Sequence, residues 1–246
     1  MTELDGCVAL VTGAGRRLGR VIARALASWG VSVAGHYHRS AEGVEELLRG
    51  EGETHHAAFQ ADLTDPAAAA DLPRRVVARF GRLDILINSA AVMERQPLGS
   101  VTAAAWDRVL QLNLRAPLLV TQAAADALRV ARGCVINMAD VSALDPWPSY
   151  LPHSASKAGL LSITRGLAEA LAPDVRVNAI VPGAVLPPAD ASEAALERAA
   201  RRALLGRLGS PDDVVGAVRY LLTARFVTGS TLVVDGGSVA RSRSDG

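Results

Sequence analysis

Seven short apolar runs, separated by longer amphipathic stretches, constrain the fold of this chain more than any other feature. The runs are residues 7–12, 31–36, 56–61, 83–88, 134–139, 175–181 and 231–236. They are apolar throughout instead of at every second position, which is typical of parallel strands covered by helices on both faces. The stretch 17–30 repeats apolar residues on one helical face and ends at Gly30. The sequence therefore predicts an α/β protein: a doubly wound parallel sheet of about seven strands with helices on both faces.

No linker rich in Pro, Gly or Ser and no internal repeat divides the 246 residues. We therefore expect a single domain over residues 1–240, followed by a flexible tail over residues 241–246. Half of the residues are hydrophobic but only 4% are aromatic, so the core must be aliphatic. Cys7 and Cys134 lie inside two of the apolar runs, and we interpret them as buried structural thiols.

The charge pattern argues against several classes of partner. The formal net charge is +1, with acidic and basic residues interspersed, unlike the basic stripe of a nucleic-acid-binding protein or a polybasic membrane patch. No apolar run approaches the ~20 residues that span a bilayer. The N-terminal MTELDG lacks the form of a signal peptide. We expect a soluble, cytoplasmic protein that binds neither nucleic acid nor a membrane.

A glycine-rich loop follows the first apolar run, with the sequence Thr12-Gly13-Ala14-Gly15-Arg16-Arg17-Leu18-Gly19. Glycines at such a place let the backbone turn sharply and approach a pyrophosphate, while the following helix offers unpaired N–H groups. Ligands of doubly wound sheets bind at the carboxyl ends of the strands, where this loop lies. The loop predicts a dinucleotide site in a Rossmann-type fold.

The end of the second run indicates which dinucleotide is bound. A protein that selects NAD usually carries Asp or Glu here to hold the ribose hydroxyls, but this chain has His36-Tyr37-His38-Arg39-Ser40. Arg39, Ser40 and His38 offer donors, and Arg16 and Arg17 lie in the neighbouring loop. Because guanidinium groups bind phosphate with two parallel hydrogen bonds, the cluster favours the 2′-phosphate of NADPH/NADP+. The alternative is a solvated basic surface. The histidines are too sparsely partnered to indicate a metal site.

These motifs, together with residues 140–157, resemble the short-chain dehydrogenase/reductase family over about residues 5–238. The stretches TGAGRRLG and HYHRS are similar to its pteridine reductase branch, in which an arginine, here Arg17, replaces the middle glycine of the loop. The resemblance implies that Asp62 contacts the adenine, that Lys157 holds the nicotinamide ribose and that Asn113 anchors a proton-relay water. The cofactor-binding residues that it implies are Gly13, Gly15, Arg16, Arg17, Leu18, Gly19, His38, Arg39, Ser40, Asp62, Leu63, Asn88, Ser89, Ala90, Lys157, Pro182 and Gly183.

The chain departs from the family at two catalytic positions. In His153-Ser-Ala-Ser-Lys157, histidine stands where the family has its catalytic tyrosine, and Asp140 stands where it has serine. We predict Asp140, His153, Lys157 and Asn113 as the catalytic residues. The residues expected to face the substrate are Met93, Trp147, Tyr150 and Leu186. An aromatic residue that stacks on the pterin ring in the pteridine branch falls at about Met93.

The two departures compensate each other chemically in our interpretation. A carboxylate beside His153 favours the imidazolium form, which is a competent acid, whereas the nearby Lys157 opposes it. Hydride addition to a ketone builds up an alkoxide charge and requires a donor. Hydride addition to an iminium ion removes a positive charge, so a carboxylate suits that reaction better. Tyr150, in a proline-flanked loop, remains an alternative proton donor.

The sequence therefore predicts an NADPH-dependent oxidoreductase that transfers hydride to a small C=N substrate (an imine or a pterin-like heterocycle) or to a C=O substrate. The alternative is an NADP-binding scaffold or sensor without hydride-transfer activity. Lys157 and Asn113 favour the enzyme, because a scaffold has no chemical need for them. The resemblance also implies a homotetramer or homodimer.

Overall fold

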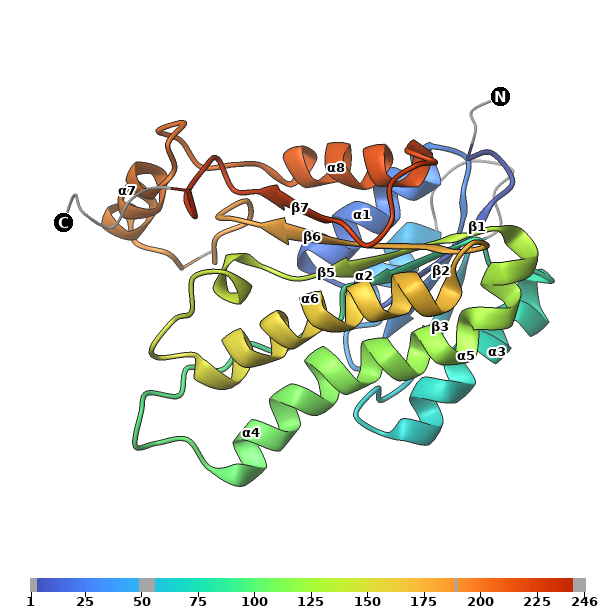
Figure 1. The fold of residues 1–246 in the computed structure, drawn as a ribbon, viewed down its shortest axis with the longest axis horizontal. Helices are drawn as coiled ribbons and strands as arrows, with labels where there is room; N and C mark the ends of the chain where they lie inside the picture. Colours follow the sequence, from blue (N-terminus) through green and yellow to red (C-terminus); the bar gives the residue numbers. More distant parts are fainter. Residues whose placement is uncertain (1–3, 49–55, 189, 241–246) are drawn as a thin grey trace.

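A computed structural model describes residues 4–48, 56–188 and 190–240, and its centre is one parallel sheet (Figure 1). The seven strands lie in the order β3-β2-β1-β4-β5-β6-β7, and every neighbouring pair is parallel. The strands are β1 Val8–Val11, β2 Ser32–Tyr37, β3 Ala57–Gln60, β4 Ile85–Asn88, β5 Cys134–Met138, β6 Arg176–Pro182 and β7 Thr231–Val234. Each of the seven apolar runs overlaps one of these strands, and five contain the whole strand; β2 and β6 each extend one residue beyond their run. The predicted doubly wound α/β fold is confirmed.

Helices cover both faces of the sheet, with α1 and α8 on one face and α3, α5 and α6 on the other (Figure 1). Their bounds are α1 Arg17–Ser28, α2 Glu42–Leu48, α3 Pro66–Phe80, α4 Ala103–Leu110, α5 Ala116–Ala131, α6 Leu151–Leu171, α7 Glu193–Arg202 and α8 Pro211–Thr223. A π-helical turn, η1 Gln111–Arg115, joins α4 to α5, and a 3-10 turn, η2 Val141–Ala143, follows β5. Among the described residues, no helix is both long and apolar enough to span a membrane.

Two aliphatic layers hold the sheet between the helices. Ile22, Leu26 and Leu221 pack between the sheet and the pair α1/α8, whereas Leu72 and Leu128 pack on the opposite face against α3 and α5. All five side chains are buried. Burial of each such side chain stabilises the fold by about 1.5–3 kcal/mol, so the two layers fix the sheet and with it the loops at its carboxyl edge.

The sheet reverses its strand order at β1, which pairs with β2 on one side and with β4 on the other. Where the connections that follow two adjacent parallel strands run to opposite sides of the sheet, a crevice opens at the carboxyl ends of those strands. The glycine-rich loop follows β1 there, and Asn88 is the last residue of β4. The fold therefore puts the predicted dinucleotide loop at the switch point.

The helical stretch 108–128, which contains Pro117, differs in one respect from its sequence pattern. A proline inside a helix usually kinks it, but Pro117 lies in the first turn of α5, where its missing N–H breaks no helical hydrogen bond. The irregularity falls one turn earlier, in the π-helical turn that carries Asn113. Such π turns inside helices are frequent at functional sites. The predicted tail, residues 241–246, lies outside the described residues.

Candidate active site

The glycine-rich loop contacts the end of β4 so closely that Gly13 can carry no side chain. Gly13 has a φ of +71°, and a Cβ added to it would lie 2.9 Å from the Cα of Ala90. The hydroxyl of Thr12 accepts the backbone N–H groups of Ser89 and Ala90 at 2.9 and 3.0 Å. The loop after β1 and the Asn88–Ala90 segment are thus one rigid unit at the switch point.

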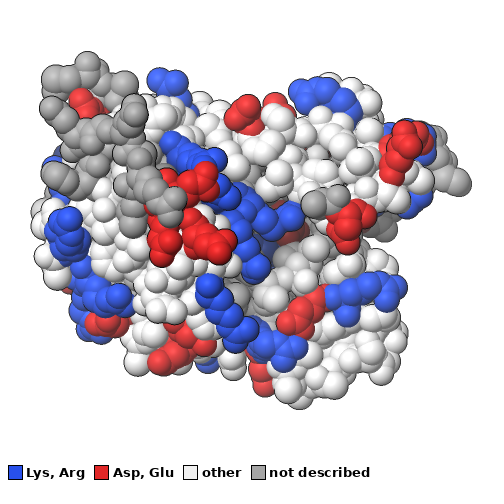
Figure 2. Space-filling view, turned by 180° about the vertical axis from the view of Figure 1, so that it is seen from behind, with Lys and Arg blue, Asp and Glu red and all other residues white. Residues whose placement is uncertain are grey.

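The residues that follow β2 form the polar end of this unit. His38, Arg39 and Ser40 are exposed, as is Arg16 of the glycine-rich loop. The carboxylate of Asp62 accepts the N–H and hydroxyl of Thr64, and these two hydrogen bonds lower the pKa of Asp62. In Figure 2, basic side chains gather beside a hollow in the middle of the face, and acidic and basic side chains alternate elsewhere.

Arg17 lies differently from the other basic residues of this region. It has a φ of +50°, and its guanidinium donates to the carbonyl of Leu186 at 2.5 Å. Arg17 therefore connects the glycine-rich loop to the segment after β6 and does not join the exposed residues after β2, with which the sequence grouped it. Leu186, which the sequence assigned to the substrate site, is half-buried at this crossing.

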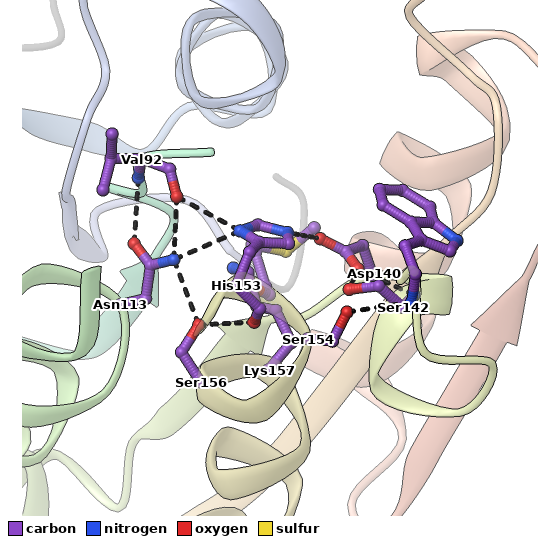
Figure 3. Close-up of polar contacts among 10 residues, drawn as sticks. Val92, Asn113, Asp140, Ser142, His153, Ser154, Ser156 and Lys157 are labelled. Atoms are coloured by element: carbon purple, nitrogen blue, oxygen red, sulfur yellow. Dashed lines mark hydrogen bonds and ion pairs between the residues drawn. The ribbon is translucent and has the colours of Figure 1, made fainter. Parts of the chain in front are cut away.

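Asp140 and His153 lie in direct contact, as their proposed compensation requires (Figure 3). The Nε2 of His153, in the first turn of α6, lies 2.6 Å from the Oδ2 of Asp140, which caps η2. The other oxygen of this carboxylate accepts the N–H of Ser142 at 2.8 Å. The Asp140–His153 dyad is therefore assembled where two neighbouring segments, η2 and α6, meet beyond β5.

The second ring nitrogen of His153 faces both an acceptor and a donor. Its Nδ1 lies 3.1 Å from the carbonyl oxygen of Val92 and 3.3 Å from the amide nitrogen of Asn113. The amide of Asn113 fixes that carbonyl, because its Oδ1 accepts the N–H of Val92 and its Nδ2 donates to the Val92 oxygen, both at 2.9 Å. Because an ionised carboxylate can only accept, the Nε2 must carry a proton, whereas the Nδ1 can donate to Val92 or accept from Asn113. The geometry therefore fixes a hydrogen bond from the Nε2 of His153 to the carboxylate of Asp140.

The carboxyl group of Asp140 is stabilised in its ionised form. Burial alone would raise its pKa, but the hydrogen bond from His153, the charges of Lys157 and His153, and the hydrogen bond from Ser142 together lower it to about 2. Charge-assisted hydrogen bonds of this kind are stronger than neutral ones. Asp140 is thus an anion at any pH at which the protein would be assayed.

Lys157 is the single lysine of the chain, which has 25 arginines. It lies one helical turn after His153, is buried, and donates from its Nζ to the carbonyl of Met138 at 2.7 Å. Burial lowers the pKa of Lys157, and the charge of Asp140 opposes this shift. In a chain that uses arginine everywhere else, a compact ammonium at this one position indicates a specific chemical requirement.

A cavity of about 600 Å³ opens beside the dyad, between η2, the segment after β6 and the residues around α7. Asp140 and Trp147 line it. His153 lies behind Asp140 with 3% of its side chain exposed, and the Trp147 ring stacks on it at 6.3 Å between centroids. The carboxylate of Asp140, with 21% of its side chain exposed, is therefore the part of the dyad that a molecule in the cavity would meet.

The other predicted residues are placed around this centre. Tyr150 caps α6 and packs edge-on against Trp147 at 5.9 Å. Pro182 ends β6, and the N–H of Gly183 donates to Val234. Leu63 is buried, whereas Met93 is 53% exposed. Within the described part of the chain, no group of three or more His, Cys, Asp or Glu side chains could hold a metal.

Three contacts of this site have no counterpart among the sequence predictions. The Val92 carbonyl is a backbone group, so no residue type indicates it. Ser142 and Ser156 hold Asp140 and Asn113, and the Ser156 hydroxyl lies 3.1 Å from the Asn113 amide. Ser142 two residues after an aspartate is a local signal, because Asp side chains commonly accept an N–H two residues on.

Comparison with known proteins identifies the family. The family model described as Enoyl-(Acyl carrier protein) reductase matches residues 13–239. The chain is 35% identical to 3beta-hydroxysteroid dehydrogenase 1 of Eggerthella lenta, with 96% of this chain and 94% of that protein covered. It superimposes on a short-chain dehydrogenase/reductase from Serratia marcescens with a TM-score of 0.90 at 32% identity, covering 97% of this chain and all of that one. The chain belongs to the short-chain dehydrogenase/reductase family.

Members of this family bind a nicotinamide cofactor, and the residues at the switch point described above fit one. One structural neighbour, a blue fluorescent protein from a metagenomic library, was solved in complex with NADPH; its TM-score is 0.88 at 32% identity, and 96% of this chain and 99% of that one are covered. The chain is also 34% identical to the 3-oxoacyl-[acyl-carrier-protein] reductase of a Synechocystis species, over 97% of this chain and 99% of that enzyme. The chain is thus an oxidoreductase by family.

Proposed function

We propose that the protein is an NADPH-dependent reductase whose substrate is a small molecule with a protonated C=N bond. The observation that carries this proposal is the contact of 2.6 Å between Asp140 and His153, with Asp140 on the cavity side. This contact determines both the charge of the site and the kind of hydrogen-bonding group that it presents to a substrate.

The preference for NADPH over NADH rests on the residues after β2. Arg39, Ser40 and His38 are exposed donors, and the stretch 36–40 contains no carboxylate that would bind ribose hydroxyls. A 2′-phosphate supplies the acceptor oxygens that these donors match. Resemblance to the pteridine reductase branch rests on the same stretch and on Arg17, but the exposed Met93 gives a pterin ring no aromatic partner, so a smaller heterocycle fits better.

The substrate class follows from matching donors to acceptors. Both ring nitrogens of His153 are occupied by Asp140 and Val92, so the ring offers no donor to the cavity. An ionised carboxylate such as Asp140 is an acceptor only. A protonated imine presents an N–H donor to it, whereas a ketone presents lone pairs that a carboxylate repels. The site is therefore complementary to C=N–H⁺.

The residues of the site have separate roles in this reaction. When bound, NADPH would supply a hydride to the carbon of the C=N bond, which leaves a neutral amine, so the site need not deliver a proton in that step. Asp140 orients the N–H of the substrate, and His153 and Ser142 hold the carboxylate in place. Asn113 fixes the Val92 carbonyl that orients His153. Lys157 would hold the nicotinamide ribose, as in the family resemblance.

A scaffold or sensor that binds NADP without turnover is the second candidate. The observation that favours it is the sealed position of His153 behind Asp140 and Trp147, because an acid that never meets substrate cannot protonate a carbonyl. The family's proton donor has then been lost, and only the cofactor site remains in use.

The test compares substrates that are matched in shape. The purified protein is mixed with NADPH and either 1-pyrroline or cyclopentanone, which share a five-membered ring, and NADPH oxidation is followed by absorbance. We expect the wild type to turn over the imine and both Asp140→Asn and His153→Phe to lose most of this activity. The control is Asp145→Asn, which should change the activity little. Asp145 is a second carboxylate of the same cavity and is paired with Arg202. Preferential reduction of the ketone contradicts the assignment. Tight NADPH binding with no turnover of a wider imine, pterin and ketone panel supports the scaffold.

A further inference from the structure

A second buried histidine, His36, lies at the cofactor end of the sheet and differs from His153 in its hydrogen bonds. It belongs to β2, and 3% of its surface is exposed. Its Nδ1 accepts the backbone N–H of Gly13 at 3.1 Å. Its Nε2 lies 3.1 Å from the carbonyl oxygen of Ala61.

These two contacts fix the charge and tautomer of the ring. A backbone N–H can only donate, so the Nδ1 of His36 must carry a lone pair. A carbonyl can only accept, so the Nε2 must carry the proton. His36 is therefore a neutral imidazole in one tautomer, with Nδ1 as the acceptor and Nε2 as the donor.

The ring joins two loops that come from different strands. Gly13 belongs to the glycine-rich loop after β1, and Ala61 is the first residue after β3, immediately before Asp62. The backbone of His36 adds a third link, because its carbonyl accepts the N–H of Ala14 at 2.9 Å. One side chain thus ties the two loops that border the adenosine half of the proposed cofactor site.

We propose that His36 is a positioning residue for cofactor binding: its neutral ring holds the Gly13 and Ala61 loops at the separation that the adenosine half of NADPH requires. This inference rests on the cofactor site of the proposed function and goes beyond it, since His36 itself touches no ligand. Loss of the ring would leave the Gly13 N–H and the Ala61 carbonyl without their buried partner, and both loops would relax.

The surroundings keep the ring neutral. Burial lowers the pKa of His36 to about 4; the hydrogen bond to Ala61 and the charge of Asp62 oppose this shift, while His38 and Arg75 reinforce it. The link to Gly13 is therefore maintained at every pH above about 5, and protonation would replace its acceptor with a second donor.

Three substitutions separate the two hydrogen bonds. His36→Phe keeps a ring but removes both bonds, His36→Asn places an amide oxygen near the position of Nδ1, and His36→Gln places an amide nitrogen near the position of Nε2. The matched control is His56→Phe, because the Nδ1 of His56 accepts the N–H of Val33 in the same strand at 3.1 Å. Thermal melting of each variant verifies that it is folded.

Calorimetry then measures two halves of the cofactor separately: 2′,5′-ADP for the adenosine half and reduced nicotinamide mononucleotide for the other half. We expect His36→Phe to weaken 2′,5′-ADP binding about tenfold, the equivalent of one hydrogen bond. Binding of the mononucleotide should not change, His36→Asn should recover part of the loss, and His56→Phe should bind both probes like the wild type. If His36→Phe does not fold, the same inference requires His36→Asn to bind 2′,5′-ADP more tightly than His36→Gln.

Each contrary result has a distinct meaning. A folded His36→Phe with wild-type affinity for 2′,5′-ADP, an equal loss for both probes, or an equal loss in His56→Phe overturns the positioning role alone. A wild-type protein that binds no 2′,5′-ADP overturns the cofactor assignment and the inference that depends on it.

Discussion

Removing either member of the Asp140–His153 dyad should be costly, and removing both should cost less than the sum. The single variants are Asp140→Asn, which keeps the shape of the side chain but loses its charge, and His153→Phe, which keeps a ring but loses both ring nitrogens. The double variant completes a thermodynamic cycle, from which the interaction between the two side chains is obtained.

The expected magnitude follows from the geometry. The contact of 2.6 Å is a charge-assisted hydrogen bond between a ring with 3% and a carboxylate with 21% of its side chain exposed. Breaking a buried pair by removing one partner costs about 3–5 kcal/mol. Because Ser142 still supports the Asp140 carboxylate, we expect the lower end, about 3 kcal/mol, for His153→Phe. We expect a coupling free energy of about 2 kcal/mol, within the range for hydrogen bonds to charged groups.

Urea unfolding of the four proteins at pH 7.5, without nucleotide, measures this coupling free energy. Equal slopes of the unfolding curves are the control that all four share one unfolded state. If the two single losses add up to the loss in the double variant within about 0.5 kcal/mol, the side chains do not interact and the reasoning is refuted.

Two further predictions concern the cofactor and pH. Arg39→Ala should weaken NADPH binding by tenfold or more and leave NADH binding unchanged, as measured by fluorescence titration; wild-type protein with equal affinity for both nucleotides would contradict the 2′-phosphate assignment. The pKa of His36 is lowered from 6.5 to about 4 in the folded protein, so the free energy of unfolding should fall by about 3 kcal/mol as the pH drops from 6.5 to 4, because the unfolded chain takes up the proton first. The pKa of Asp140 is lowered from 3.8 to about 2, which adds a loss of about 2 kcal/mol between those two values. His36→Phe should remove the first loss in acid titrations of stability and keep the second.

The inner strands of the sheet were predictable from the sequence because they are buried on both faces. Val8–Val11, for example, is apolar and buried at all four positions, and this signal does not depend on which neighbour the strand pairs with. The start of a helix was predictable as well, because its signal lies in neighbouring residues. At the start of α8, the N–H of Ser210 donates to the carboxylate of Asp213 at 2.7 Å, and serine followed by an acidic residue three positions on is a recognised capping pair.

The site was predictable only in part. The spacing of His153 and Lys157 places both on one face of a helix, and the contact of His153 with Asp140 follows if η2 and α6 meet. The direction of Arg17 could not be read from the sequence, because an arginine in the glycine-rich loop reaches either the β2 end or the segment after β6. Hydrogen bonds to backbone groups, such as the Val92 carbonyl and the Gly13 N–H, carry no residue signature, so no sequence pattern indicates them.

The protonation state of His153 can be measured directly. Nitrogen NMR of protein labelled at the histidine ring nitrogens, assigned by comparison with His153→Phe, reports whether each nitrogen carries a proton. At pH 7, the Nε2 of wild-type His153 should carry the proton that it donates to Asp140, and its resonance should shift in Asp140→Asn. A bare Nε2 in wild-type His153 at the same pH would contradict the hydrogen bond to the carboxylate on which the proposed chemistry depends.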